Sequence, residues 1–150
     1  IYSLSKQSNL AGYRAAFAAG DEKLIKGLVN LRMHSGMMVP MPVQMAIAAA
    51  LGDDEHVAKQ KEIYRKRRDV LLPALIAYGF DVQDSEAGLY LWATKGQDCW
   101  ETISELAELG IVAVPGEFYG EAGKNFVRFS ITATDQEVLE AANRLKNALG

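Results

Sequence analysis

A lysine, two serines and an arginine lie close together near the start of the sequence. Lys6 follows a short stretch with strand-like alternation, in which Ser3 and Ser5 precede it. Arg14 comes eight residues later, beyond a glycine. A lysine at the end of a strand can point into a cleft, where a lowered pKa would make its amine a nucleophile. Serine hydroxyls and an arginine can bind a phosphate group through charge-assisted hydrogen bonds.

The same residue types are common in surface turns. A lysine and an arginine exposed in a loop would explain this segment without any chemistry. The residues alone therefore leave two interpretations open, a surface turn or a nucleophilic lysine beside a phosphate site.

Hydrophobic spacing predicts the elements that position this segment. Two short strands are predicted, at 1–5 and 13–20, and neither has a predicted partner strand in the chain. Helices are predicted over 21–34, 43–51 and 54–78, with an extended, proline-containing connector at 37–42. Strands and helices then alternate, with strands at 80–82, 88–93, 111–114 and 125–131 and helices at 99–109 and 135–149. This order predicts an α/β fold.

Composition narrows the classes of function. The 150 residues are 49% apolar and 23% charged, which is typical of a globular protein, and the net charge of -3 argues against nucleic acid as a main partner. A single cysteine, Cys99, excludes an intrachain disulfide and fits a reducing compartment. No apolar run approaches the roughly 20 residues of a membrane helix, so we expect a cytoplasmic protein without a membrane partner. His34, His56 and Cys99 lack ligand spacing, and no metal site is predicted.

The first segment resembles the cofactor-lysine signature of class I/II aminotransferases, which are fold-type I pyridoxal-phosphate (PLP) enzymes. That pattern has small and apolar residues before the lysine, and fixed small, apolar, glycine and arginine positions after it. Ten residues satisfy it in register: Ser3, Leu4, Ser5, Lys6, Asn9, Leu10, Gly12, Arg14, Ala15 and Ala16. The stretch 125–131 resembles the late family strand that carries an arginine for the substrate. The resemblance covers essentially the whole chain.

The resemblance implies roles for five residues. Lys6 would bind PLP covalently and move the proton between the substrate and the cofactor. Ser3 and Arg14 would bind the cofactor phosphate, and Ser5 is a further candidate for the same role. Arg128 would bind the substrate α-carboxylate, because its planar fork pairs with a carboxylate in bidentate geometry. The alternative for Arg128 is an ion pair with an acid on the sheet surface.

The resemblance also implies a domain organisation, that of the C-terminal part of a PLP-dependent transferase fold. Residues 1–53 would form the end of the large PLP-binding domain, with the lysine segment and linking helices. Residues 54–150 would form the small C-terminal α/β sandwich domain, including the long interdomain helix. Family members have an N-terminal part that supplies the acid for the pyridine nitrogen and further cofactor ligands, so this chain alone is expected to be inactive.

The implied reaction transfers an amino group between an amino acid or amino-dicarboxylate and a 2-oxo acid, in a homodimer. All five methionines lie between positions 33 and 45, which fits an adaptable interface or ordinary core filling. A narrower similarity is to the succinyl-diaminopimelate or N-acetylornithine-like branch of lysine-biosynthesis enzymes. Two other functions stay open: a PLP-dependent carbon–sulfur β-lyase on the same scaffold, and a non-catalytic sensor or dimerisation domain.

Overall fold

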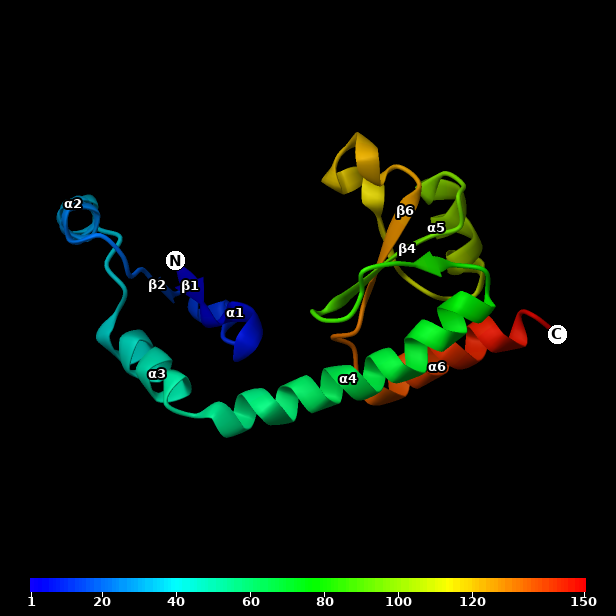
Figure 1. The fold of residues 1–150 in the computed structure, drawn as a ribbon, viewed down its shortest axis with the longest axis horizontal. Coiled ribbons are helices and arrows are strands. Elements are labelled where there is room, and N and C mark those ends of the chain that lie inside the picture. Colours follow the sequence, from blue (N-terminus) through cyan, green and yellow to red (C-terminus); the bar gives the residue numbers. More distant parts are fainter. The chain divides into compact units, whose positions relative to one another are not determined.

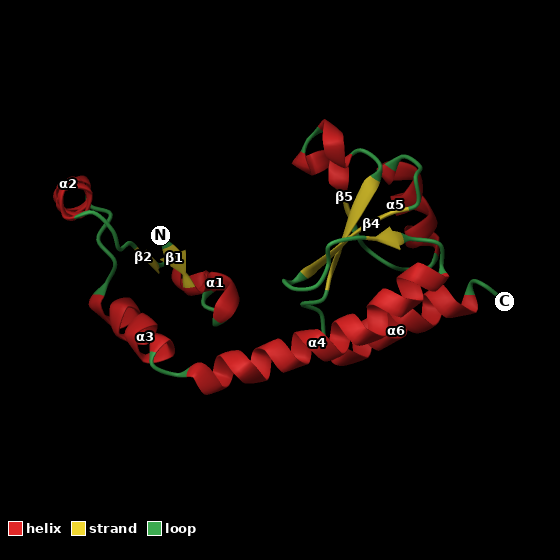
Figure 2. Cartoon of the chain, in the orientation of Figure 1, coloured by secondary structure: helices red, strands yellow, loops and turns green.

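The computed structural model describes residues 1–150, which divide into two compact units, Ile1–Lys61 and Glu62–Gly150 (Figure 1). The division falls inside the longest helix, α4 (Asp54–Ala77), which begins in the first unit and ends in the second. The mixed content of helices and strands confirms the predicted α/β class (Figure 2). No helix is both long enough and apolar enough to cross a membrane.

The first unit consists of short elements around Lys6, followed by longer helices. They are β1 (Tyr2–Ser3), α1 (Leu4–Gln7), the 3-10 turn η1 (Ala11–Tyr13), β2 (Ala16–Phe17), α2 (Glu22–Ser35), α3 (Met41–Leu51) and the start of α4. Strands β1 and β2 pair in antiparallel fashion. Asp21 begins α2 as predicted, because its carboxylate accepts the backbone N–H of Leu24.

Three strand predictions are wrong in this unit. The predicted strand 1–5 ends at Ser3, because Leu4 is buried and opens a helical turn. The predicted strand 13–20 shrinks to two residues, because Arg14 adopts a left-handed conformation that interrupts an extended chain. The two strands also have partners after all, since they pair with each other.

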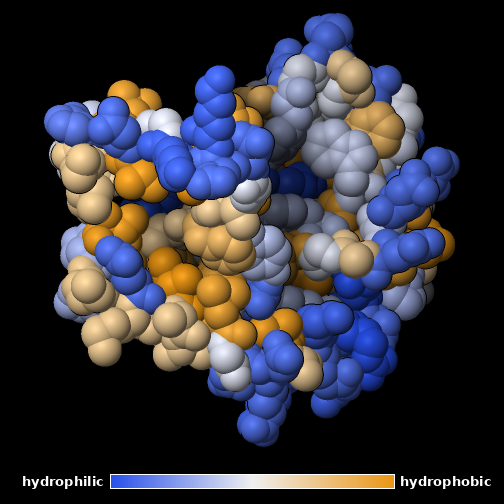
Figure 3. Space-filling view, turned by 60° about the vertical axis from the view of Figure 1, so that its left-hand side comes forward, coloured by the Kyte–Doolittle hydropathy of each residue, from blue (hydrophilic) through white to orange (hydrophobic).

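Helices α2 and α3 contribute no buried side chain to the first unit. Figure 3 shows apolar side chains gathered on the surface of this unit. The large exposed apolar residues of the two helices and of the loop between them are Leu24, Leu28, Val29, Leu31, Met33, Met37, Met38, Met41, Met45 and Leu51. All five methionines are on this list, so core filling within the chain is the wrong explanation for them.

The second unit is a four-stranded sheet packed against three helices (Figures 1 and 2). The strands are β3 (Asp81–Val82), β4 (Tyr90–Thr94), β5 (Val114–Pro115) and β6 (Phe126–Ser130), in the order β3-β4-β6-β5, and every neighbouring pair is antiparallel. The helices are the second half of α4, α5 (Cys99–Glu108) and α6 (Asp135–Asn147). Two 3-10 turns, η2 (Gly116–Tyr119) and η3 (Glu121–Gly123), connect β5 to β6. The strand predicted at 111–114 is misplaced, since β5 begins only at Val114.

One buried cluster holds the second unit together. Alternate residues of the two central strands, Leu91 and Ala93 in β4 and Val127 and Phe129 in β6, are buried against the helices. The helices contribute Leu71, Ala74, Leu75, Cys99, Leu106, Val138, Ala142 and Leu145. Because side chains alternate along a strand, the intervening residues of β4 and β6 lie on the opposite face of the sheet, and Arg128 is one of them.

Candidate functional site

The predicted phosphate ligands lie together in the first unit. Ser3 precedes α1, and its Oγ accepts the backbone N–H of Ser5 at 3.2 Å and donates to Ser5 Oγ at 2.8 Å. Both serines and Arg14 line one cavity of about 210 Å³. The pairing of β1 with β2 explains this arrangement, because it places Ser3 opposite Ala16, close in sequence to Arg14.

A second guanidinium lines the same cavity and was not predicted from the sequence. It belongs to Arg32 of α2, which also donates to the carbonyl of Met37. The other lining residues are Ala15, Ala16 and Val39, so no carboxylate faces the cavity. Two hydroxyls and two guanidiniums without a carboxylate fit a dianionic group such as a phosphate. No local pattern marks Arg32, since only the path of the chain through α2 places it beside Arg14.

The backbone of Arg14 is strained. Its φ of 51° and ψ of 42° lie in the left-handed region, which costs a non-glycine residue about 1–2 kcal/mol. Its side chain donates to the carbonyl of Ala11 at 3.0 Å. Glycine would adopt this conformation at a lower cost, so the position carries an arginine at the expense of backbone strain. Strain of this kind clusters at ligand-binding positions.

Lys6 has a free amine. It lies in the last turn of α1, is exposed, and has neither a hydrogen bond nor an ion pair to its ammonium. Lys23 and Lys61 of this unit are likewise unpaired, whereas Lys26 lies 2.5 Å from Glu22 and Lys59 lies 2.6 Å from Glu55. The Lys6 amine is therefore available for a reaction, although Lys6 does not itself line the 210 Å³ cavity.

Arg128 of the second unit lies among aromatic rings. Its guanidinium carbon is 4.1 Å from the ring centroid of Tyr90 and 5.4 Å from that of Tyr119. Trp92 pairs with Arg128 across β4 and β6, and it packs edge-on to Tyr119 and stacks on Phe126. The rings hold the guanidinium by cation–π contact, which uses none of its N–H donors. This aromatic support does not follow from any pattern in the sequence.

Arg128 also lacks an anionic partner within the chain. Its Nε is buried without a hydrogen-bond acceptor, and no carboxylate pairs with it. Three other arginines of the unit do have such partners, as in the 2.5 Å ion pair between Arg67 and Asp135. Arg68 has none, but its guanidinium donates to the carbonyl of Gly88 at 2.8 Å. The alternative interpretation of Arg128, an ion pair with an acid on the sheet surface, is therefore wrong. A half-buried cation without a counter-charge favours an anionic ligand.

The family model for aminotransferase class I and II matches residues 1–145. The chain belongs to this family. It is 54% identical over 145 residues to the 4-dedimethylamino-4-oxo-anhydrotetracycline transaminase OxyQ of Streptomyces rimosus, a match that covers 97% of this chain and 40% of that protein. It is 35% identical over 150 residues to the LL-diaminopimelate aminotransferase of Halothermothrix orenii, covering 97% and 39%.

Solved structures agree with this assignment. An aminotransferase from Neisseria meningitidis superposes with a TM-score of 0.87 at 31% identity, covering 97% of this chain and 39% of that one. The chain thus spans about 40% of the length of the curated relatives that it matches.

Aminotransferases of this class are generally PLP-dependent, and the residues present fit part of that cofactor. The cavity lined by Ser3, Ser5, Arg14 and Arg32 suits its phosphate, and the unpaired amine of Lys6 suits its aldehyde. Two hydroxyls and two guanidiniums are donors that suit a phosphate group.

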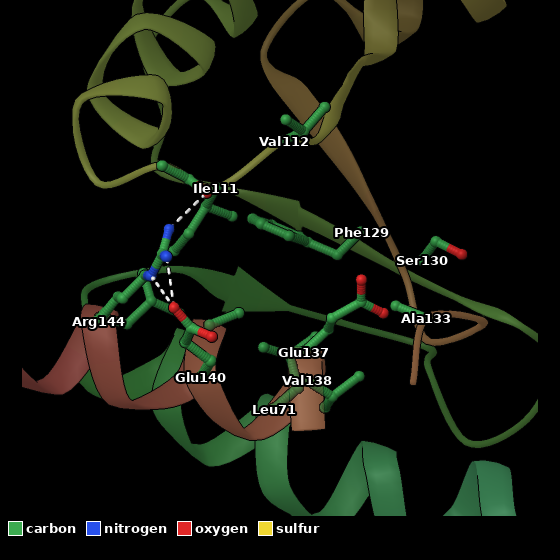
Figure 4. A pocket seen from close by; sticks show the side chains of 13 residues that line it. Leu71, Ile111, Val112, Phe129, Ser130, Ala133, Glu137, Val138, Glu140 and Arg144 are labelled. Atoms are coloured by element: carbon green, nitrogen blue, oxygen red, sulfur yellow. Dashed lines mark hydrogen bonds and ion pairs between the residues drawn. The ribbon is translucent and has the colours of Figure 1, made fainter. Parts of the chain in front are cut away.

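The aminotransferase chain has a further cavity of about 310 Å³ in the second unit, beside α6 (Figure 4). Its charged side chains already have partners. Arg144 donates to the carbonyl of Gly110 at 2.8 Å and pairs with Glu140, while the carboxylate of Glu137 accepts the backbone N–H and the hydroxyl of Thr134. Because these charged groups are paired with each other or with neighbouring polar groups, the cavity offers no free charge for a substrate. None of the predicted site residues lines it.

Proposed function

We propose that this chain is the C-terminal part of a PLP-dependent aminotransferase that transfers an amino group between an amino acid or amino-dicarboxylate and a 2-oxo acid. The observation that carries the proposal is the convergence of Ser3, Ser5 and Arg14 on one cavity, near a lysine whose amine has no partner. PLP, when bound, supplies an electron sink that makes the α-proton of the substrate acidic.

Each of the predicted site residues would have its own role in the reaction. Lys6 would hold the cofactor through its amine, and once released would take up and return the α-proton. Ser3, Ser5 and Arg14 would hold the phosphate and so fix the cofactor in place. Arg128 would orient the substrate by binding its α-carboxylate. The free N–H donors of Arg128 and its aromatic support favour this role.

The names of the relatives support an amino acid with a second polar end as substrate. Several are LL-diaminopimelate aminotransferases, whose named substrate carries two carboxylates and two amines. The narrower similarity to the succinyl-diaminopimelate or N-acetylornithine-like branch stays a prediction. The 54% identical relative is named for a tetracycline precursor, so substrates within the family differ widely.

We propose that the enzyme is a homodimer. Helices α2 and α3 and the loop between them expose apolar side chains, among them all five methionines, and neither helix contributes a buried side chain. A helix in water depends on packing of its apolar face, and methionine-rich faces adapt well to a partner. The remaining part of the enzyme and a second copy would cover this surface. The cytoplasmic location expected from the sequence stays a prediction.

The carbon–sulfur β-lyase and the non-catalytic sensor stay as rivals, because both could keep the same lysine and arginines. Product analysis separates them. An aminotransferase converts one 2-oxo acid into an amino acid while consuming another amino acid. A β-lyase releases ammonia, a 2-oxo acid and a thiol from one substrate, and a sensor releases nothing.

Reductive trapping tests the cofactor assignment directly. The full-length protein and the chain 1–150 would each be incubated with PLP, reduced with borohydride and mapped by peptide mass spectrometry. We expect the adduct at Lys6, its loss in Lys6→Ala, and no change in Lys23→Ala, a lysine in the same unit. Label spread over exposed lysines, or none at all in the full-length protein, would remove the proposal. The chain alone is expected to show no transamination.

A further inference from the structure

Three polar side chains in the first unit form a row that the proposed reaction does not use. Ser8 follows Lys6 by two positions, and its Oγ lies 2.9 Å from Nε2 of His56 in a half-buried contact. Nδ1 of the same ring lies 3.2 Å from Oδ2 of Asp53. His56 lies in the first turn of α4, so the row joins the segment after the lysine to the start of that helix.

The hydrogen positions in this row follow from Asp53. The backbone N–H of His56, together with that of Glu55, bonds to the Asp53 carboxylate and holds its pKa below the usual value. An ionised carboxylate requires the proton of the ring on Nδ1, which leaves Nε2 of a neutral His56 as an acceptor. The hydroxyl of Ser8 then donates to Nε2.

A second contact strengthens the same connection. Asn9 Nδ2 donates to Oε1 of Gln60 at 3.4 Å. Gln60 lies four residues after His56, so both contacts come from one side of α4. Asn9 also has a positive φ of 54°, which is uncommon for a residue other than glycine, although asparagine adopts it more often than most.

The row resembles a serine–histidine–aspartate triad, but its surroundings do not suit acyl transfer. A nucleophilic serine needs N–H donors aimed at the developing oxyanion. The backbone N–H groups of Ser8 and Leu10 are bonded to the carbonyl of Leu4. Those of Glu55 and His56 are bonded to Asp53 Oδ1. We therefore interpret the row as a structural contact between the segment after Lys6 and the start of α4, and not as an acyl-transfer site.

The segment around Lys6 needs such a connection. Helix α1 has only four residues, and its end is closed by one helical backbone bond, from the N–H of Ser8 to the carbonyl of Leu4 at 3.1 Å. A single helical turn does not recover the entropy cost of its own nucleation. Leu4 is its one buried side chain. The Ser3 cap on the N–H of Ser5 and the bond from Tyr2 to Gln7 also hold the turn, but both come from its neighbours in the sequence. The contacts from Ser8 and Asn9 are the ones that connect the turn to α4.

We propose that His56 and Gln60 are positioning residues that fix the Lys6 turn against the start of α4, with Asp53 orienting the His56 ring. The inference rests on the proposed function, since it assumes that Lys6 binds PLP. Misplacement of the lysine would slow its reaction with the cofactor and alter the setting of the bound ring, without removing any phosphate ligand.

The test uses the full-length protein, four single variants and the double variant Ser8→Ala/His56→Ala. His56→Ala removes the acceptor, His56→Gln offers an amide oxygen to Ser8 in its place, and Ser8→Ala removes the donor. His34→Ala is the matched control, because that exposed ring bonds only to a carbonyl of its own helix, Asn30, at 2.8 Å. The readouts are the rate of borohydride-trapped PLP on Lys6 and the visible circular dichroism of the bound cofactor, with urea unfolding to compare overall stability.

Loss of one hydrogen bond predicts a trapping rate about two- to tenfold lower in His56→Ala, with a changed visible dichroism. We expect His56→Gln to recover to within about twofold and His34→Ala to match the wild type. Ser8→Ala should equal His56→Ala, and the double variant should be no worse than either. If His56→Ala fails to fold, the comparison of Ser8→Ala with the wild type decides the question.

Two results would overturn the inference while leaving the function intact: trapping at the wild-type rate in Ser8→Ala or His56→Ala, or additive losses in the double variant. Absence of trapping on Lys6 in the wild-type protein is a different result. It would refute the PLP assignment itself, and the positioning role would fall with it.

Discussion

The Arg128 assignment makes a quantitative prediction for Arg128→Ala and Arg128→Lys in the full-length enzyme. A hydrogen bond to a charged group contributes about 1.5–3 kcal/mol, so losing a bidentate pair to a carboxylate should cost about 3–5 kcal/mol of transition-state binding. That corresponds to a fall in kcat/KM of about two to four orders of magnitude. Lysine keeps the charge and loses the fork, so about 10- to 100-fold is expected for Arg128→Lys.

The free energy of unfolding should change much less than the activity in Arg128→Ala. Cation–π contacts with Tyr90 and Tyr119 contribute about 0.5–1 kcal/mol each at exposed sites. The substitution also removes an Nε that is buried without a partner, which relieves a penalty of about 1–3 kcal/mol. The two effects oppose each other. We therefore expect the free energy of unfolding of Arg128→Ala to stay within about 1 kcal/mol of the wild type, as measured by urea denaturation.

The assay compares each amino acid that proves active with the amine obtained by removing its α-carboxylate. The wild type should strongly prefer the amino acid, and Arg128→Ala should lose most of that preference. Arg144→Ala is the matched control, because Arg144 bonds to the carbonyls of Leu109 and Gly110 and pairs with Glu140. It should lose stability and keep the preference. An Arg128→Ala enzyme that still discriminates like the wild type would refute the carboxylate role.

Three further predictions follow from other parts of the chain. Arg14→Gly releases about 1–2 kcal/mol of backbone strain and loses the bond to Ala11, so the free energy of unfolding should change by no more than about 1 kcal/mol. PLP retention on dialysis should fall at least about tenfold, because the variant lacks a phosphate ligand. The backbone N–H and hydroxyl of Thr134 hold the pKa of Glu137 below its usual 4.5. The resulting stabilisation is therefore fully present above that value and is lost as the pH falls through the lower folded pKa. Glu137→Gln should unfold more easily than the wild type in urea at pH 7, and this difference should shrink as the pH is lowered below 4.5. Leu75→Ala should lower the free energy of unfolding by about 2–5 kcal/mol, because Leu75 is fully buried. Ile76→Ala truncates the exposed side chain next to it and should lower the free energy of unfolding by less than about 1 kcal/mol, with both variants compared by thermal denaturation.

The helices could be predicted from the sequence because each depends on a local pattern. In α6, Val138, Ala142 and Leu145 recur at helical spacing and are all buried. The predicted start of α3 is two residues late, because the prediction keeps the chain extended through Pro42. Helix α3 begins at Met41, and Pro42 occupies an early helical position, where its missing N–H is not needed. Strand ends were less predictable, since pairing across the sheet decides them.

The candidate site could be predicted where its members are neighbours in the sequence. Ser3, Ser5 and Arg14 fall within one pattern, and the structure brings them to one cavity. Arg32 was missed because the whole of α2 separates it from that pattern. The support of Arg128 by Tyr90 and Tyr119 was missed for the same reason, since it depends on the pairing of β4 with β6 and on the turn η2.

The distribution of burial has a consequence for how the lysine site forms. In the first unit only Leu4 and Ala15 are buried apolar residues, whereas the second unit has a continuous core. Burial of apolar surface is the main term that offsets the entropy cost of ordering a chain. The second unit can therefore order itself, while the lysine turn, α2 and α3 need a surface that residues 1–150 do not provide. The contacts that fix the turn carrying Lys6 should thus be less stable in the chain 1–150 than in the assembled enzyme, and reductive trapping on Lys6 should be slower in that chain than in the full-length protein. Equal rates in the two would show that the contacts of Ser8 and Asn9 with α4 are sufficient to order the turn.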